Sequence, residues 1–361
     1  MKKGWSAVAL APTVSADTRR RVVVTAPDAV EIQTDAPPSL ADGEALVELL
    51  VSGLCGSDKA GAHGVHAFFK PPYFPGHEVV GRVGAVAPGV DTVSAGQRVT
   101  VRPTLDCGDC KPCNTGRSNL CENLEFFGCG FREGGMSDVF TVRADRLHTI
   151  PDSFTDLQAA MIEPLATPVH AVRLAGDLTG KTVVVLGSGT IGLLTQIAAR
   201  HAGARVVIAT DVRQVKRDVS LRLGADAALD AAREDLAEAV RAELGESADV
   251  VFDCVSIEST VNAAIAMAVK GGTVVVVGGP KGRVGVDLPL LQEFQVKLQG
   301  AATYLAEDFD VAAEIIASGA VDTDEFITAK FPLADAAAAF ESLATGDEVK
   351  IVVTGEGFTE K

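Results

Sequence analysis

The chain has 361 residues, of which 47% are hydrophobic and 22% are charged. This balance is typical of globular proteins and excludes a disordered chain, and the length is sufficient for two domains. The formal net charge of −16 disfavours binding to nucleic-acid phosphates. No apolar run in the sequence approaches the roughly 18 residues needed to cross a membrane.

The N-terminus carries a weak signal-peptide pattern, because two lysines precede an apolar stretch. That stretch is only about five residues long, shorter than the usual 7–15, so we predict a first strand at Ser6–Ala11 instead. Seven cysteines are an odd number, and four of them are clustered, which favours metal binding over disulfides. These features predict a cytoplasmic protein.

The first third of the chain is predicted to be β-rich. Short β-branched or alternating runs are separated by Pro, Gly and Asp, a pattern typical of a small barrel. The predicted strands are Val22–Thr25, Ala29–Gln33, Ala45–Val51, Val79–Val86 and Arg98–Arg102.

After about residue 165 strands alternate with helices, which predicts βαβ units and a doubly wound parallel sheet. Predicted strands are Lys181–Leu186, Arg205–Thr210, Asp249–Asp253, Thr273–Val277 and Val296–Leu298, and predicted helices are Thr190–Ala202, Val212–Leu223 and Ser259–Val269. The Ala-rich and acidic segment Asp226–Glu246 is predicted to be one solvated helix. The tail is predicted to contain two helices, Phe309–Ser318 and Ala334–Ala344, and a last strand, Lys350–Val353.

A glycine motif follows the predicted strand Lys181–Leu186 and opens a helix. Gly187, Gly189 and Gly192, with Thr190 and Ile191 between the last two, form the G-x-G-x-x-G fingerprint of dinucleotide binding, in which amides at the helix start face the pyrophosphate. Asp211 ends the next strand, 19 residues after Gly192. Its carboxylate is expected to accept hydrogen bonds from the ribose and to repel a 2′-phosphate, which favours NAD over NADP. Nearby cations at Arg213, Lys216 and Arg217 weaken that preference.

The strongest local signal is a cluster of four thiols, Cys107, Cys110, Cys113 and Cys121. Four thiolates on one short loop can surround a tetrahedral Zn²⁺ with no position left open, as in structural zinc sites. An iron–sulfur cluster is the functional alternative and disulfides are the other. Zinc is the favoured interpretation.

A second candidate metal site is dispersed along the sequence. Cys55, the pair His77 and Glu78, and the distant Glu163 offer the thiolate, imidazole and carboxylate donors of a catalytic zinc with one open position. A buried cysteine and a capped histidine without a metal are an equally common alternative.

Several motifs together resemble the medium-chain, zinc-dependent alcohol dehydrogenase family. They are Cys55-Gly56-Ser57-Asp58, Gly76-His77-Glu78-Val79-Val80-Gly81, the four-cysteine lobe, Gly134-Gly135-Met136-Ser137-Asp138 and Ile162-Glu163-Pro164-Leu165-Ala166. The likeness runs in order from Ala45 to the last strand. Within the family, the sequence is most similar to the polyol (sorbitol-like), butanediol and threonine dehydrogenases.

The resemblance implies an α/β architecture in which a GroES-like β-barrel catalytic domain carries an inserted Rossmann domain. The implied catalytic domain spans residues 1–165 and 304–361, with its zinc lobe at about 103–124, and the NAD-binding domain spans residues 166–303. It also implies a homodimer or homotetramer, for which we predict edge pairing of strands near Val284–Leu288.

The resemblance further implies roles for individual residues. Cys55 and His77 would bind a catalytic zinc, with Glu78 and Glu163 competing for the third protein position. Ser57 would pass the substrate proton toward the cofactor ribose, and Asp58 would orient His77, although an aspartate that only caps a turn is an equal alternative. The cofactor-binding set implied is Gly187, Gly189, Thr190, Ile191, Gly192, Asp211, Lys216, Val277 and Gly278, and the full complement is NAD and two Zn²⁺ per chain.

The sequence departs from the family at two positions. Ala60 stands where many relatives have a relay histidine, and the nearby His63 and His66 are expected to be loop residues. Thr303 precedes Tyr304 where polyol enzymes often carry an arginine. The aromatic residues near the predicted site are either a substrate pocket or plain core, with core favoured: Phe68, Phe69, Tyr73, Phe126, Phe127 and Phe131.

The resulting hypothesis is a zinc-dependent, NAD-linked dehydrogenase that acts on a secondary alcohol of a polyol, cyclitol or diol. An amino alcohol such as threonine is the alternative substrate. A non-catalytic protein that binds NAD and zinc is the alternative from a different class, and it predicts damaged catalytic ligands. We expect a small-molecule substrate and neither a nucleic acid nor a membrane as partner.

Overall fold

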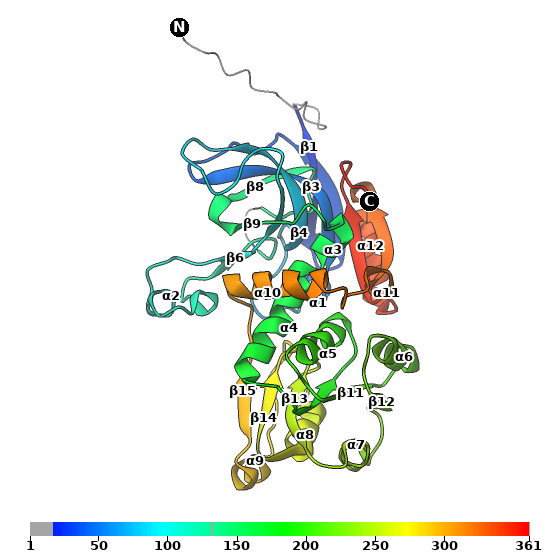
Figure 1. Cartoon of the computed structure of the whole chain (residues 1–361). Helices are drawn as coiled ribbons and strands as arrows, with labels where there is room; N and C mark the ends of the chain where they lie inside the picture. The colour runs from blue at the N-terminus through cyan, green and yellow to red at the C-terminus, as the bar shows by residue number, and fades with distance from the viewer. Residues whose placement is uncertain (1–16, 131–132, 361) are drawn as a thin grey trace.

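The structure is a computed structural model that describes residues 17–130 and 133–360. Two sheets dominate it, and Figure 1 shows the β-rich part above the alternating part, with helices between them. The predicted strand Ser6–Ala11 and Phe131 lie outside the described residues.

The upper part is built on a seven-stranded sheet of order β16-β17-β3-β4-β5-β9, with β8 also paired to β3. It combines N-terminal and C-terminal strands, because β17 pairs antiparallel with β3. A hairpin and a short pair of strands complete it. The strands are β1 (Arg19–Ala26), β2 (Ala29–Asp35), β3 (Glu44–Leu54), β4 (Glu78–Val86), β5 (Arg98–Val101), β6 (Thr104–Leu105), β7 (Glu125–Phe126), β8 (Val139–Arg143), β9 (Leu147–Thr149), β16 (Ile327–Pro332) and β17 (Lys350–Thr354).

Few helices accompany the upper sheet, and most of them are short. Two of them, α1 and α2, each begin directly after a cysteine that the sequence predicts to bind metal. The helices are α1 (Gly56–Ala62), α2 (Lys111–Asn114), η1 (Ser118–Leu120), η2 (Ala144–Arg146), α3 (Asp156–Ala160), α11 (Thr323–Phe326), η3 (Leu333–Asp335) and α12 (Ala336–Thr345).

The lower part is a six-stranded parallel sheet of order β12-β11-β10-β13-β14-β15. The order reverses between β10 and β13, so a crevice forms there at the carboxyl ends of the strands. Its strands are β10 (Thr182–Leu186), β11 (Val206–Asp211), β12 (Ala227–Asp230), β13 (Ala248–Asp253), β14 (Ala268–Val276) and β15 (Lys297–Gly300), and its helices are α5 (Thr190–His201), α6 (Gln214–Arg222), α7 (Leu236–Leu244), α8 (Glu258–Met267) and α9 (Leu288–Phe294).

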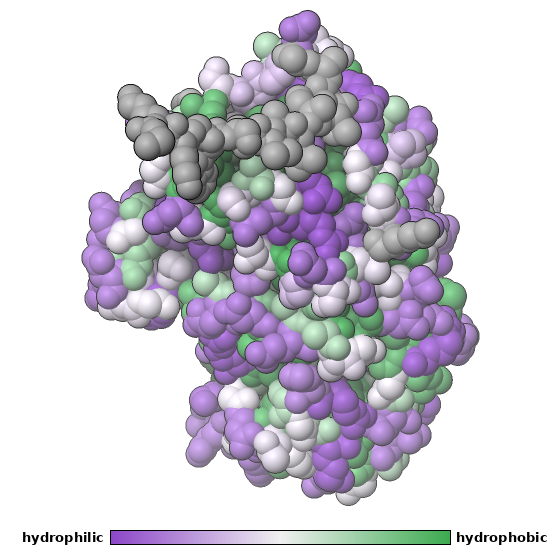
Figure 2. Space-filling view, turned by 45° about the horizontal axis from the view of Figure 1, so that its top comes forward, coloured by the Kyte–Doolittle hydropathy of each residue, from purple (hydrophilic) through white to green (hydrophobic). Residues whose placement is uncertain are grey.

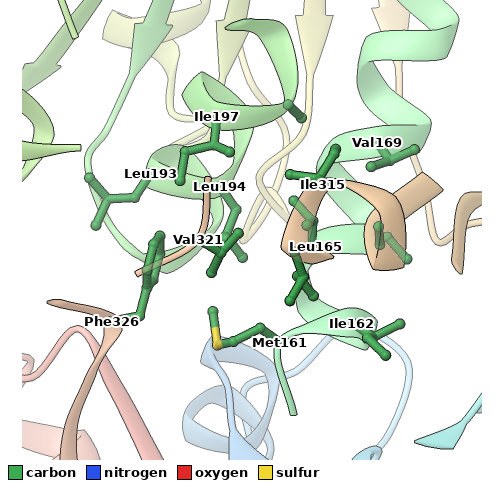
Figure 3. Close-up of a cluster of buried hydrophobic side chains, with 14 of the residues drawn as sticks. Met161, Ile162, Leu165, Val169, Leu193, Leu194, Ile197, Ile315, Val321 and Phe326 are labelled. Carbon is green, nitrogen blue, oxygen red and sulfur yellow. The ribbon is translucent and has the colours of Figure 1, made fainter. Parts of the chain in front are cut away.

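Two further helices, α4 (Ile162–Ala175) and α10 (Ala306–Ala317), lie between the sheets. Their buried side chains pack with those of α5 and with Val321 and Phe326 in one hydrophobic cluster (Figure 3). The cluster also includes Val51 and Val80 of the upper sheet and Val183 and Val185 of the lower one, so both parts share a core.

The architecture confirms the predicted fold class, a mostly antiparallel β-rich part with an inserted doubly wound parallel sheet. One local prediction is wrong. Residues 227–230 of the predicted solvated helix instead form the edge strand β12. This half-buried segment pairs in parallel with β11 and so extends the sheet by one strand. Within the single chain Val284–Leu288 forms no strand, since α9 begins at Leu288, and the predicted pairing between subunits near these residues stays a prediction.

No helix in the described parts of the chain has both the length and the apolar character that a bilayer crossing requires.

Candidate active site

The glycine motif occupies the turn between β10 and α5. Gly187 has φ +90°, a left-handed conformation that favours glycine. A Cβ on Gly192 would lie 1.7 Å from the carbonyl oxygen of Gly187, so the helix can pack this closely only without a side chain. At Gly189 a Cβ would meet nothing within 4 Å, and this residue is exposed at the start of α5. The turn therefore leaves open space at a helix N-terminus, as a bound pyrophosphate requires.

Asp211 ends β11 beside this turn. Its carboxylate accepts hydrogen bonds from the backbone N–H of Ser188 at 2.9 Å and of Arg213 at 2.9 Å. The carboxylate of Asp211 is thus held next to the glycine turn by these two hydrogen bonds. Val277 and Gly278 follow β14, where both backbone N–H groups donate to the carbonyl of Asp253.

The cations near Asp211 already have partners from the C-terminal segment. Arg213 donates to the carbonyl of Gly346 at 2.7 Å and pairs with Asp347 at 2.8 Å, and Lys216 Nζ donates to the carbonyl of Glu348 at 2.9 Å. Burial lowers the pKa of Lys216, and the neighbouring Arg213 lowers it further. These contacts connect the dinucleotide half of the site to the segment that leads into β17.

Cys55, His77 and Glu78 form the second half of the site. Their ligand atoms all lie within 4.8 Å of one another, and Cys55 Sγ is 3.2 Å from His77 Nε2. Cys55 lies at the start of α1, where its sulfur accepts the backbone N–H of Ser57 at 3.2 Å. Thiolate, imidazole and carboxylate form a donor set that suits a catalytic Zn²⁺.

The other ring nitrogen of His77 has two polar neighbours. Nδ1 is 3.4 Å from Cys129 Sγ and 3.8 Å from Asp58 Oδ1. The second carboxylate oxygen of Asp58 accepts the backbone N–H of Cys55 at 3.0 Å, so this aspartate caps α1 as well as facing the histidine. Burial alone lowers the pKa of His77, but the charges of Cys129, Cys55 and Asp58 outweigh it and raise that pKa well above its usual range.

Two carboxylates in this region are buried with different partners. Glu78 forms an ion pair with Lys350 of β17, and both side chains are 2% exposed. Glu163 lies near the start of α4 and accepts a hydrogen bond from the hydroxyl of Tyr304. Burial raises the pKa of Glu163 to about 7, and the nearby negative charge of Glu78 contributes to the shift. Of the two competing glutamates, Glu78 is the one grouped with Cys55 and His77.

The four-cysteine lobe stands out from the body of the molecule and has a mostly hydrophilic surface (Figures 1 and 2). Its four sulfurs lie within 4.8 Å of one another, and the pairs Cys110–Cys113, Cys107–Cys121 and Cys110–Cys121 are separated by 3.4, 3.4 and 3.8 Å. Sulfurs about 2.3 Å from a central ion are about 3.8 Å apart in a tetrahedron, so the lobe fits Zn²⁺. All four thiols are unbonded, which excludes the disulfide alternative in this structure.

Comparison with known proteins agrees with this geometry. Residues 41–152 match the alcohol dehydrogenase GroES-like domain and residues 190–318 match the zinc-binding dehydrogenase domain. D-xylulose reductase A of Aspergillus oryzae is 31% identical over 88% of this chain and 91% of its own length. Sorbitol dehydrogenase of Bacillus subtilis is 29% identical over 84% and 87%. The chain belongs to the zinc-dependent, medium-chain polyol dehydrogenase family.

Solved structures give the same result for the whole fold of this dehydrogenase. A protein of Sinorhizobium meliloti 1021, described as a zinc-binding dehydrogenase and solved with NADP bound, superposes with a TM-score of 0.88 at 31% identity. The match covers 94% of this chain and 99% of the other. The recognised family and the combination of a GroES-like part with a Rossmann sheet are therefore confirmed.

Three residues of the dehydrogenase site were missed as partners by sequence reasoning. Cys129, Tyr304 and Lys350 contact His77, Glu163 and Glu78, respectively. Their partners lie 52, 141 and 272 residues away in the sequence, so no spacing rule relates them. For Lys350 the sequence did offer a signal, because it begins the predicted last strand and a charged residue on a buried strand is rarely left without a partner.

The aromatic residues divide between core and surface. Tyr73 and Phe127 are fully buried core residues, Phe68 is 93% exposed, and Phe69 packs on His66 and Tyr73. Phe126 lies with its ring edge-on to His77 at 5.9 Å between centroids, and the hydroxyl of Tyr73 donates to the backbone carbonyl of Asp58 at 3.3 Å. Of the two loop histidines, His63 pairs with Asp28 away from the metal ligands.

Proposed function

We propose that this dehydrogenase oxidises a secondary alcohol of a polyol, cyclitol or diol, with NAD as hydride acceptor and zinc at Cys55, His77 and Glu78. The observation that carries the proposal is the start of β17, where consecutive residues contact both half-sites. The carbonyl of Val349 accepts the hydroxyl of Thr190 at the start of α5, and Lys350 pairs with Glu78. These two contacts support a site in which the dinucleotide turn and the proposed metal ligands act together.

We assign separate steps of proton transfer to individual residues of the chain. A bound zinc would supply Lewis-acid polarisation of the alcohol oxygen. Glu163 is suited to hold a proton near neutral pH, because burial raises its pKa to about 7. Ser57, half-buried beside Cys55, is the residue we assign to pass the substrate proton toward the cofactor ribose. The substitution at Ala60 removes the usual next histidine, so the proton would continue through ribose and water.

We propose a preference for NAD because of the carboxylate of Asp211 and because the neighbouring cationic side chains, Arg213 and Lys216, already bind the C-terminal segment. Arg213 and Lys216 would have to release the Gly346–Glu348 segment before they received a 2′-phosphate. We expect kcat/KM to be about 100-fold higher with NAD than with NADP, and Asp211→Ala to reduce that ratio about tenfold, because the repulsive charge and the ribose acceptor are both lost. Initial rates with each cofactor at saturating substrate and zinc measure the ratio.

Two controls accompany this variant. The side-chain oxygen of Asp211→Asn can still accept one of the two backbone N–H groups, of Ser188 or of Arg213, that bind Asp211. This variant therefore separates the effect of losing the charge from the effect of disturbing the turn. Asp218→Ala removes an exposed carboxylate on the neighbouring helix and should leave the ratio unchanged. Equal use of both cofactors by the unaltered enzyme would contradict the proposed role of Asp211.

The substrate class is proposed from the relatives, which act on xylulose or sorbitol according to their names. Thr303 in place of arginine removes one charged handle for a polyhydroxy substrate, so diols and cyclitols belong in the test alongside sugar alcohols. NADH formation should be measured on polyols, cyclitols, diols, threonine and simple secondary alcohols. No turnover by zinc-loaded enzyme on any of them would favour the non-catalytic alternative.

We further propose a second, structural zinc in the four-cysteine lobe and a homodimer or homotetramer in the cytoplasm. The sulfur positions support the zinc. The edge strand β15, whose four residues are all exposed, supports self-association through the parallel sheet. A monomeric mass in light scattering would contradict the oligomer.

A further inference from the structure

A buried polar network connects the four-cysteine lobe to the middle of the molecule. Asn119 lies in η1, two residues before Cys121, and is 5% exposed. Its side-chain Nδ2 donates to the carbonyl of Ala302 at 3.1 Å and lies 3.3 Å from His170 Nε2. His170 of α4 is bonded through Nδ1 to Asp308 of α10 at 2.9 Å. Three segments far apart in the sequence are thus joined beside the lobe.

The donor and acceptor capacities of these groups determine the direction of each hydrogen bond. A carbonyl oxygen only accepts, so the amide nitrogen of Asn119 must face Ala302 and its second hydrogen points to His170 Nε2. His170 then accepts at Nε2 and donates from Nδ1 to the carboxylate of Asp308. Asp308 also accepts the backbone N–H of Leu305 at 2.7 Å, which caps α10. Each of these hydrogen bonds, from Ala302 through Asn119 and His170 to Asp308, therefore has a defined donor and acceptor.

The network holds a backbone conformation that is unfavourable by itself. Thr303 has φ +53°, which is rare for a β-branched residue and persists only where surrounding contacts impose it. Asn119 contacts this residue and the one before it: its side chain donates to the carbonyl of Ala302, and its backbone carbonyl accepts the hydroxyl of Thr303 at 3.3 Å. The next residue, Tyr304, is 2% exposed and donates its hydroxyl to Glu163.

We infer that Asn119 is a positioning residue, which fixes the connection between β15 and α10 so that Tyr304 holds Glu163 in its working orientation. The four-cysteine lobe then contributes to turnover and not only to stability, because it carries Asn119. This inference deepens the proposed function and rests on it. The role assigned to Asn119 is distinct from ligation, since its side chain contacts neither set of metal ligands that the described residues form.

The test is a double-mutant cycle with Asn119→Asp and Tyr304→Phe. Aspartate has nearly the same shape as asparagine but cannot donate to Ala302, so packing is retained while the hydrogen bond is lost. We expect Asn119→Asp to lower kcat about tenfold with the KM for NAD unchanged within about twofold. The double variant should be no slower than Tyr304→Phe alone, because both changes act on the same hydroxyl.

Three further measurements separate this inference from a structural role and from failure of the proposed function. Metal content should stay at two ions per chain, and crystal structures of Asn119→Asp should show the Tyr304 hydroxyl displaced from Glu163. A lowered unfolding midpoint with unchanged kcat, or additive effects in the cycle, would overturn the inference. Absence of turnover in the unaltered enzyme would instead overturn the proposed function, and the crystallographic result would still test the position of Tyr304.

Discussion

Replacing Cys55 with alanine is expected to remove one zinc ion per chain and to lower kcat/KM about 10³-fold or more, while the fold is retained. The expectation follows from the donor set, because His77 and Glu78 alone leave two protein ligands where catalytic zinc sites have three. Changes to groups that only orient ligands already cost 10–100-fold, so loss of a ligand should cost more. Elemental analysis and initial rates measure the two effects.

Cys254→Ala is the matched control for this variant. Cys254 is also a free thiol, but its sulfur lies near Thr195 and outside both groups of metal-binding side chains that the described residues form. This control should retain two zinc ions. Full turnover by Cys55→Ala, or an unchanged zinc content, would show that the catalytic metal is held elsewhere.

In protein freed of the proposed catalytic zinc, Lys350→Met is expected to lower the free energy of unfolding by about 3–5 kcal/mol, because it leaves the carboxylate of Glu78 buried with neither the lysine nor a metal ion beside it. Methionine keeps most of the volume and the apolar stem, so the loss reports charge and not a cavity. Urea unfolding followed by circular dichroism measures the effect. The second variant, Lys350→Met with Glu78→Gln, should recover part of the loss, since no buried charge is left unpaired.

A surface pair on the neighbouring strand provides the comparison. Lys330 of β16 pairs with Glu360, but these side chains are 37% and 65% exposed, respectively, so water screens the pair. Lys330→Met should therefore change stability much less than Lys350→Met. Equal losses for the two lysines would show that burial of the Lys350–Glu78 pair contributes nothing.

Features encoded within a short stretch of sequence were predictable. The glycine motif requires a tight turn, an open approach and close helix packing, and each requirement falls on one glycine within six residues. The four thiols of the lobe are similarly local. Strand–helix alternation gave the parallel sheet, because buried parallel strands are apolar on both faces. The strand β12 was missed because its Ala-rich, half-buried sequence lacks that signal.

Features that depend on long-range contacts were not predictable. The competition between Glu78 and Glu163 could not be resolved from the sequence, because their partners Lys350 and Tyr304 come from the C-terminal third of the chain. Cys129 was not predicted as a neighbour of His77, because the two residues are 52 positions apart in the sequence. Asp58 illustrates the limit well, since it both caps α1 and faces His77, and the sequence offers these as alternatives.

The pairing of β17 with β3 has a consequence for the order in which the protein acquires structure during synthesis. All strands of the parallel sheet lie between Thr182 and Gly300, so that sheet can be complete in the growing chain when β3 has β4 and β8 beside it but not yet β17. The strand β17, and with it Lys350 that pairs with Glu78, emerges from the ribosome about 300 residues after β3. The inserted domain can therefore fold first, and the metal-binding half is completed only after β17 has been synthesised.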